Sequence, residues 1–108
     1  MSVSFQNRQQ KLIACLSGEI DHHSASPIRD AIDRRIRQDK PSVLHLDFSG
    51  VTFMDSSGVG LVMGRYRQLQ PYNGVLELGG MSPTIKRIMR LSGIESIAVV
   101  VERKGKSQ

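Results

Sequence analysis

Residues 43–60 read VLHLDFSGVTFMDSSGVG, and this stretch decides the fold. Its first six residues are mostly apolar and lie between turn-forming residues, which is typical of a strand buried in a sheet. Apolar residues recur at helical spacing from Val59 onward. The segment 54–60, Met-Asp-Ser-Ser-Gly-Val-Gly, is therefore predicted to connect a strand to a helix.

The helix after this connection is expected over 56–70. Its predicted apolar face consists of Val59, Val62, Met63, Tyr66 and Leu69 or Gln70. Arg65, Arg67 and Gln68 then fall on the opposite, solvated face.

Two interpretations of Asp55, Ser56 and Ser57 are open on spacing alone. The N–H groups at a helix start are unpaired and favour an anion, so a serine there suits phosphorylation. The other interpretation is helix capping, with Gly58 and Gly60 permitting close packing. Capping needs only one such residue, so at least one of the hydroxyl groups is not needed for it. The glycines have no side chain, so a partner can approach that hydroxyl closely. Short Ser/Gly motifs match by chance too often to decide between the two.

The pattern of apolar residues switches regularly between sheet-like and helix-like spacing, which indicates an α/β fold. Strands are expected near 4–8, 11–16, 43–48, 75–78 and 97–101, and helices over 26–38, 56–70 and 83–91. The first two strands are close enough to form a hairpin. Each helix leads into another strand, so right-handed parallel crossovers follow, with the helices largely sharing one face of a mixed sheet.

Local signals support these boundaries. Ser26-Pro27 and Ser82-Pro83 each place a capping hydroxyl before a proline at the first helical position, and Gly93 supplies a helix stop. Two apolar stripes are predicted to face the core: one contains Ile28, Ile32 and Ile36, and the other Ile85, Ile88, Met89 and Leu91. We expect a single domain over 1–108, with an ordered core at about 3–101 and a disordered basic tail at 102–108.

Loops that leave the carboxyl ends of parallel strands gather at one edge of a sheet and build its site. Here those loops are 18–23, 54–58 and 79–83. Among their residues are Asp21 and Asp55, two histidines, two adjacent serines and flexible glycines. The sequence therefore predicts one functional surface at this edge.

Catalysis at that surface is poorly supported. A serine nucleophile elbow needs a glycine two residues before the serine, where this chain has Met54 and Asp55. The adjacent His22 and His23 tend to diverge, no zinc-ligand spacing is present, and the chain lacks both glycine-rich nucleotide-binding motifs. We expect no catalytic residue, no metal and no cofactor, and a phosphate acceptor rather than an ATP user. A small hydrolase or transferase using Ser56 with His22 or His23 is the alternative from another class.

The chain has a formal charge of +5, with basic residues scattered over three helices and the tail and no tryptophan. This distribution argues against a nucleic-acid partner, and the excess charge favours an acidic protein partner or a nearby triphosphate.

Cys15 lies in an apolar run and is expected to be a buried thiol, which fits a reducing compartment. No secretory leader and no apolar stretch near the ~18 residues of a membrane span is present, so a soluble cytoplasmic protein is expected, with no membrane partner.

The whole pattern over about 3–101 resembles the STAS family. The resemblance is carried by Gly-Glu-Ile-Asp-His-His at 18–23, Phe-Met-Asp-Ser-Ser-Gly at 53–58 and Gly-Arg-Tyr-Arg at 64–67. Within the family the match is to anti-sigma factor antagonists of the stage II sporulation protein AA type. The resemblance implies a single STAS domain with a four- to five-stranded mixed sheet packed by about three to four helices, and no catalysis.

It also implies a partner: an anti-sigma factor that is a serine kinase with bound ATP or ADP, from which a sporulation sigma factor is displaced. The kinase would phosphorylate Ser56, which abolishes binding, and a serine phosphatase would reverse this. A general-stress antagonist is the alternative within the family. The residues expected to bind the partner are Asp21, His22, His23, Asp55, Ser56, Ser57, Gly58, Val59, Gly60, Met81 and Ser82.

Overall fold

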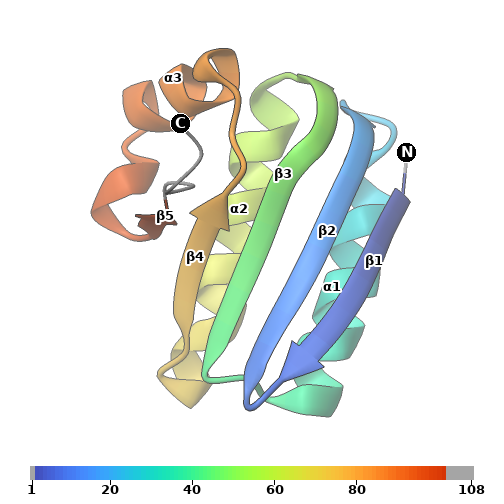
Figure 1. Cartoon of the computed structure of the whole chain (residues 1–108), viewed down its shortest axis with the longest axis vertical. Coiled ribbons are helices and arrows are strands. Elements are labelled where there is room, and N and C mark those ends of the chain that lie inside the picture. Colours follow the sequence, from blue (N-terminus) through green and yellow to red (C-terminus); the bar gives the residue numbers. More distant parts are fainter. Residues whose placement is uncertain (1, 102–108) are drawn as a thin grey trace, which may run out of the picture.

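A computed structural model describes residues 2–101. Its five strands form one sheet whose order follows the chain (Figure 1). The strands are β1 (Ser2–Arg8), β2 (Lys11–Ile20), β3 (Val43–Met54), β4 (Val75–Gly79) and β5 (Val99–Val101). The helices are α1 (Ala25–Asp39), α2 (Ser56–Leu69) and α3 (Pro83–Leu91), with two short 3-10 turns, η1 (Gln70–Tyr72) and η2 (Ile94–Ser96).

The mixed topology predicted from the sequence is confirmed. β1 pairs antiparallel with β2 across a two-residue turn in which Gln9 and Gln10 both have positive φ, at 52° and 75°. All later pairings are parallel and are joined through helices. α1 and α2 lie behind the sheet in Figure 1, and α3 lies beside its β4 end. The expected disordered tail at 102–108 lies outside the described residues.

The core lies between the sheet and α1 and α2. Alternate strand residues point into it, including Leu12, Ala14 and Leu16 of β2, and the α1 stripe of Ile28, Ile32 and Ile36 is buried against them as predicted. The other set of strand residues forms a face that no helix covers in Figure 1, called the open face below. Cys15 belongs to this open face, so the prediction of a buried thiol was wrong: its side chain is half-buried.

β2 and β3 are longer than the sequence indicated. Ser49-Gly50 resembled a turn after residue 48, but β3 continues to Met54 and pairs with β2 up to Ile20. The register shifts twice, between Cys15 and Ser17 and between Gly18 and Glu19. Gly50 supports the first irregularity, because a Cβ there would lie 2.9 Å from the Leu16 carbonyl oxygen. The strands therefore carry the backbone all the way to the Asp55 motif.

Two further boundaries and one core assignment differ from expectation. α1 begins at Ala25, so Ser26 is not its cap and Pro27 occupies the third helical position, where a missing N–H is still tolerated. β5 begins at Val99 rather than 97, because η2 occupies 94–96. Leu91 ends α3 with 74% of its surface exposed and is not part of the core. Ser82 caps α3 as predicted, accepting a 3.2 Å hydrogen bond from the Ile85 N–H.

Candidate functional site

The start of α2 places two adjacent serines in different surroundings. Asp55 is the N-cap, and its carboxylate accepts a 2.8 Å hydrogen bond from the Ser57 N–H. Ser57 is half-buried, whereas Ser56 is the first helical residue and is exposed. Capping is thus performed by Asp55, and the Ser56 hydroxyl is presented to solvent at the positive end of the helix.

The two glycines of the motif have different roles. Gly58 is buried, and a Cβ there would overlap the side chain of Met54, so this glycine serves close packing. Gly60 is exposed, and a Cβ there would meet no atom within 4 Å. The packing interpretation therefore holds for Gly58, whereas Gly60 leaves an open surface near the serines. Val59, between them, is partly buried against the core.

Asp21 organises the loop after β2. Its Oδ1 accepts hydrogen bonds from the N–H groups of Ser24 at 2.9 Å and His23 at 3.0 Å. The Ser24 N–H has the largest effect and lowers the pKa of Asp21; burial opposes this, the His23 N–H adds to the lowering, and the net shift is downward. The Asp55 N–H donates to the Ile20 carbonyl at 3.2 Å. The loop after β2 is thereby fixed beside the α2 start.

His22 and His23 are both exposed, with ring centroids 5.6 Å apart in an edge-to-face arrangement. His22 lines a groove that also contains Ser57 and Gly60. Within residues 2–101, neither histidine ring hydrogen-bonds to Ser56 or Ser57. The nucleophile and base geometry that a serine hydrolase requires is not present in this arrangement.

Met81 and Ser82 lie at a second hollow, of about 380 Å³, together with Phe48, Ser49, Val51 and Gly80. Gly80 has φ +67°, and a Cβ there would lie 2.5 Å from Asp47 Oδ1. That carboxylate oxygen accepts hydrogen bonds from the N–H and the hydroxyl of Ser49. The first groove contains Ser57 and Gly60 of the α2 motif, whereas this second hollow contains none of its residues. The residues of the predicted surface are therefore divided between two depressions.

Phe53 was not predicted as part of this surface. It lies two residues before Asp55 and is 50% exposed, an unusual position for a large aromatic side chain. Neighbouring side chains of a strand point to opposite faces of a sheet, and Met54 is buried. Had the second half of β3 been predicted as a strand, this alternation would have indicated that Phe53 is exposed.

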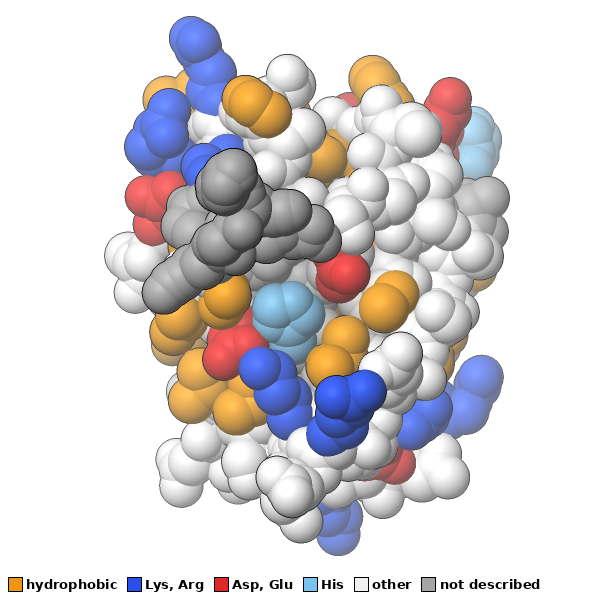
Figure 2. Space-filling model, in the orientation of Figure 1, with side chains coloured by type: hydrophobic (Ala, Val, Ile, Leu, Met, Phe, Trp, Pro, Cys, Tyr) orange, Lys and Arg blue, Asp and Glu red, His pale blue; other side chains and the backbone are white. Residues whose placement is uncertain are grey.

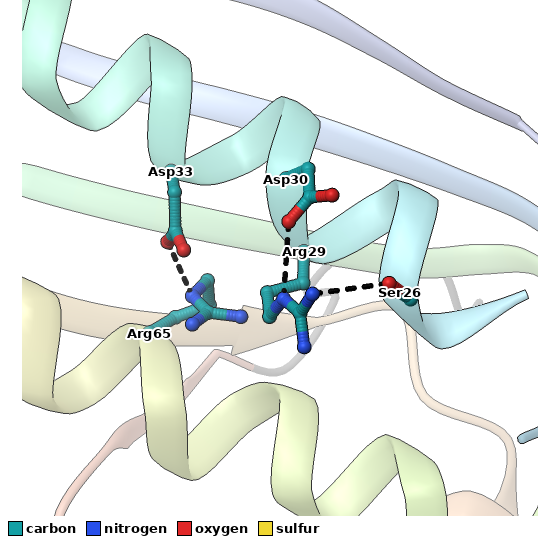
Figure 3. Close-up of polar contacts among 5 residues, drawn as sticks. All are labelled: Ser26, Arg29, Asp30, Asp33 and Arg65. Carbon is teal, nitrogen blue, oxygen red and sulfur yellow. Dashed lines mark hydrogen bonds and ion pairs between the residues drawn. The ribbon is translucent and has the colours of Figure 1, made fainter.

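Arg65 was predicted on a solvated face, and this was wrong. Only 4% of Arg65 is exposed, and its Nε lies 2.8 Å from Oδ1 of Asp33 on α1 (Figure 3). Burial lowers the pKa of Arg65, the Asp33 charge opposes that effect, and nearby Arg29 adds to it. Leu61 is also buried on this side, so α2 packs against α1 through a face rotated from the predicted one.

The open face of the sheet combines hydrophobic and charged side chains (Figure 2). At its centre Glu77 accepts from His45 at 2.9 Å and from Lys11 at 3.0 Å. Partial burial raises the pKa of Glu77, but these two partners outweigh it and the net shift is downward. Val75 and Val99 on neighbouring strands are 44% and 51% exposed.

The described residues hold no group of three or more His, Cys, Asp or Glu side chains placed to bind a metal ion. None of the helices within residues 2–101 is long and apolar enough to cross a membrane.

Comparison with known proteins adds four findings. A family model described as the STAS domain matches residues 2–104. An anti-sigma F factor antagonist of Lysinibacillus sphaericus is 38% identical over 86 residues, which is 80% of this chain and 74% of that protein. The anti-sigma factor antagonist SpoIIAA in its unphosphorylated form superimposes with a TM-score of 0.82 at 31% identity, covering 97% of this chain and 90% of that one. The Bacillus cell fate determinant SpoIIAA in the phosphorylated form gives 0.75 at 31% identity, covering 97% and 94%.

Proposed function

This chain belongs to the STAS domain family, and we propose that it is an anti-sigma factor antagonist switched by phosphorylation of Ser56. In its unphosphorylated form it binds an anti-sigma factor that is also a serine kinase, with bound ATP or ADP, and thereby releases a sigma factor. The protein is a binding module rather than an enzyme, and it acts in the cytoplasm, where transcription is controlled.

The observation that carries the proposal is the exposed hydroxyl of Ser56 at the first position of α2. Ser57 is less suitable, because it is half-buried and its N–H is bound by Asp55. A kinase needs the acceptor hydroxyl and several flanking backbone atoms to be accessible. The solved structures of SpoIIAA in an unphosphorylated and a phosphorylated form support a switch of this kind.

The charge at this edge gives phosphorylation a physical effect on binding. A phosphate adds about 1.5 to 2 negative charges beside the carboxylate of Asp55. At an effective dielectric constant near 20, two unit charges about 6 Å apart interact by roughly 3 kcal/mol, and near-bulk screening reduces this below about 1 kcal/mol. Because about 1.4 kcal/mol is tenfold in affinity, one phosphate facing a partner carboxylate weakens docking about ten- to a thousandfold. The helix N-terminus tolerates the added charge, so the fold persists.

We assign partner contact to the sheet edge around α2. The surface comprises the exposed His22, His23, Ser56 and Gly60, the half-buried Asp21, Asp55, Ser57 and Val59, and Met81 and Ser82 at the second hollow. Gly58 contributes indirectly, because it is buried and allows Met54 to support the helix start. The hydrogen bonds of Asp21 indicate that it orders the loop that carries His22.

The sporulation sigma factor is the proposed target, supported by the 38% identity to an anti-sigma F factor antagonist. A general-stress sigma factor is the alternative within the family. A serine phosphatase restores the binding form by removing the phosphate.

The test is ATP-dependent phosphorylation by a sporulation-type anti-sigma kinase, followed by intact mass and peptide mapping. Wild type and Ser57→Ala are expected to gain one phosphate, and Ser56→Ala none. Ser56→Ala should still bind the kinase, whereas Ser56→Asp should bind at least about tenfold more weakly. Phosphate on Ser57, or tight binding of Ser56→Asp, would contradict the proposed switch.

A further inference from the structure

The groove between α1 and α2 shares His22, Ser57 and Gly60 with the proposed partner surface but extends beyond that surface along both helices. It measures about 350 Å³ and is bordered by Ser26 and Arg29 on α1 and by Ser57, Gly60 and Gly64 on α2. Arg65 lines it as well, and in Figure 3 the guanidinium groups of Arg65 and Arg29 both lie in the space between the two helices.

The guanidinium of Arg65 is buried with unused donors. Its contact with Asp33 is an ion pair at 2.8 Å that lacks hydrogen-bond alignment, and its Nη1 is fully buried without a hydrogen-bond partner among the described residues. No described residue accepts from its Nη2 either. Leaving buried donors of a charged group unpaired is costly, and the Nη2 group, which is not among the fully buried atoms, is the donor that a carboxylate in the groove can reach.

The α2 side of the groove is kept open by glycines that packing does not require. A Cβ at Gly60 or Gly64 would meet no atom within 4 Å, in contrast to Gly58. A glycine inside a helix is less favourable than alanine by roughly 0.5–1 kcal/mol. What these two residues provide is therefore the empty space in front of Arg65.

The charges around the groove select the ligand. Asp33 pairs with Arg65 and Asp30 pairs with Arg29 at 3.1 Å, so the two guanidinium charges are already balanced. A singly charged acceptor is then easier to accommodate than a dianion. Ser26 and Ser57 on the rim add hydroxyl groups that can donate to a second part of the ligand.

We propose that the α1–α2 groove is a binding site for a small carboxylate, held by the Nη2 group of Arg65 in the space left by Gly60 and Gly64. Arg29 borders the site and is half-exposed, so it can turn outward to admit the ligand. The site needs neither phosphorylation nor a protein partner, and it is testable on the isolated chain.

The experiment is an NMR titration of the ¹⁵N-labelled protein with sodium acetate, with sodium chloride at equal ionic strength as reference. We expect saturable shifts of the Arg65 Nε–Hε signal and of the Gly60 and Gly64 amides, with a dissociation constant on the order of 1 mM, as suits a ligand with one charged group. Inorganic phosphate, largely a dianion above pH 7, should bind at least about threefold more weakly.

Gly64→Leu places a side chain in the groove, where a Cβ would meet no atom within 4 Å, and should weaken acetate binding at least about tenfold. Gln68→Leu is the matched control, because it adds the same type of side chain at an exposed position one turn further along α2, and it should bind acetate like wild type. Intact spectra of both variants establish that they are folded. Equal shifts with chloride, absent saturation, tighter binding of phosphate, or unchanged binding by Gly64→Leu would each overturn the proposal.

Discussion

Replacing Asp33 by alanine tests the ion pair that joins α1 to α2. The substitution removes the one carboxylate within reach of Arg65 Nε among residues 2–101 and leaves a guanidinium that is 4% exposed without its countercharge. Removing one partner of a buried pair costs about 3–5 kcal/mol, because the remaining charge is largely shielded from water and has no partner. The Asp33 side chain is itself 15% exposed, so some water reaches the position and we expect the lower end, about 3 kcal/mol.

The assay is equilibrium unfolding in urea and by heat, followed by far-UV circular dichroism. A loss of about 3 kcal/mol corresponds to a melting temperature lower by roughly 12–24 °C in a domain of this size. With a typical urea dependence for small domains, the urea midpoint falls by roughly 1–3 M.

Asp30→Ala is the matched control. Asp30 lies on the same helix and also pairs with an arginine, but the side chains of Arg29 and Asp30 are 49% and 60% exposed (Figure 3). Such surface pairs contribute less than about 1 kcal/mol. Equal destabilisation by Asp30→Ala and Asp33→Ala, or a change below about 0.5 kcal/mol in Asp33→Ala, would refute the argument from burial.

Three further predictions concern stability. Gly58→Ala should destabilise the fold by about 1–3 kcal/mol, because its Cβ overlaps Met54. Gly60→Ala should leave the stability unchanged or raise it by up to about 1 kcal/mol. Equal effects of the two substitutions in urea unfolding would disprove this contrast. Both Ser82 and Ser26 precede a proline, but only Ser82 caps a helix. Ser82→Ala should therefore lower the stability by about 1 kcal/mol, and Ser26→Ala by less than about 0.5 kcal/mol. A larger loss of stability in Ser26→Ala than in Ser82→Ala would contradict this prediction. Hydrogen bonds from Arg35 and then Asn7 lower the pKa of Asp39, so its stabilisation is present above the ordinary value of 3.8 and lost as pH falls through the lower folded value. The stability gap between wild type and Asp39→Asn should therefore close in acid, and a gap independent of pH would rule out this linkage.

Short-range sequence patterns were sufficient to predict much of the fold. Ser82-Pro83 and Gly93 bracket α3 correctly, because a capping hydroxyl and a glycine in left-handed conformation act within a few residues of their own position. The hairpin and the parallel crossovers also followed from the order and spacing of the apolar segments. These features depend on short stretches of chain and need no knowledge of the rest of the molecule.

The α2 face was misassigned for a tertiary reason. Helical spacing counts an arginine as polar, and nothing within α2 shows that Asp33 on another helix will lie opposite Arg65. Pairing the charges of consecutive helices would have provided a signal, since Leu61 and Arg65 are four residues apart and share a face. The groove was missed for the same reason, because its two walls belong to different helices.

The length of β3 was misjudged because Ser49-Gly50 has the composition of a turn. Its actual conformation is set by pairing with β2, where the irregular register brings Gly50 against the Leu16 carbonyl. As a result, the sequence located Ser56 at the correct connection but did not predict that the strand leads directly to Asp55.

The strand order β1-β2-β3-β4-β5 has a consequence for how the chain acquires its structure. Every strand pairs with the strand immediately before it in sequence, so no pairing has to wait for a distant segment, and short loop closures favour rapid folding. During synthesis the sheet can grow from its amino-terminal edge, one strand and one helix at a time. The β1–β2 hairpin and α1 are synthesised before the connection that carries Ser56. The loop bearing His22 can therefore already be formed when the start of α2 packs beside it.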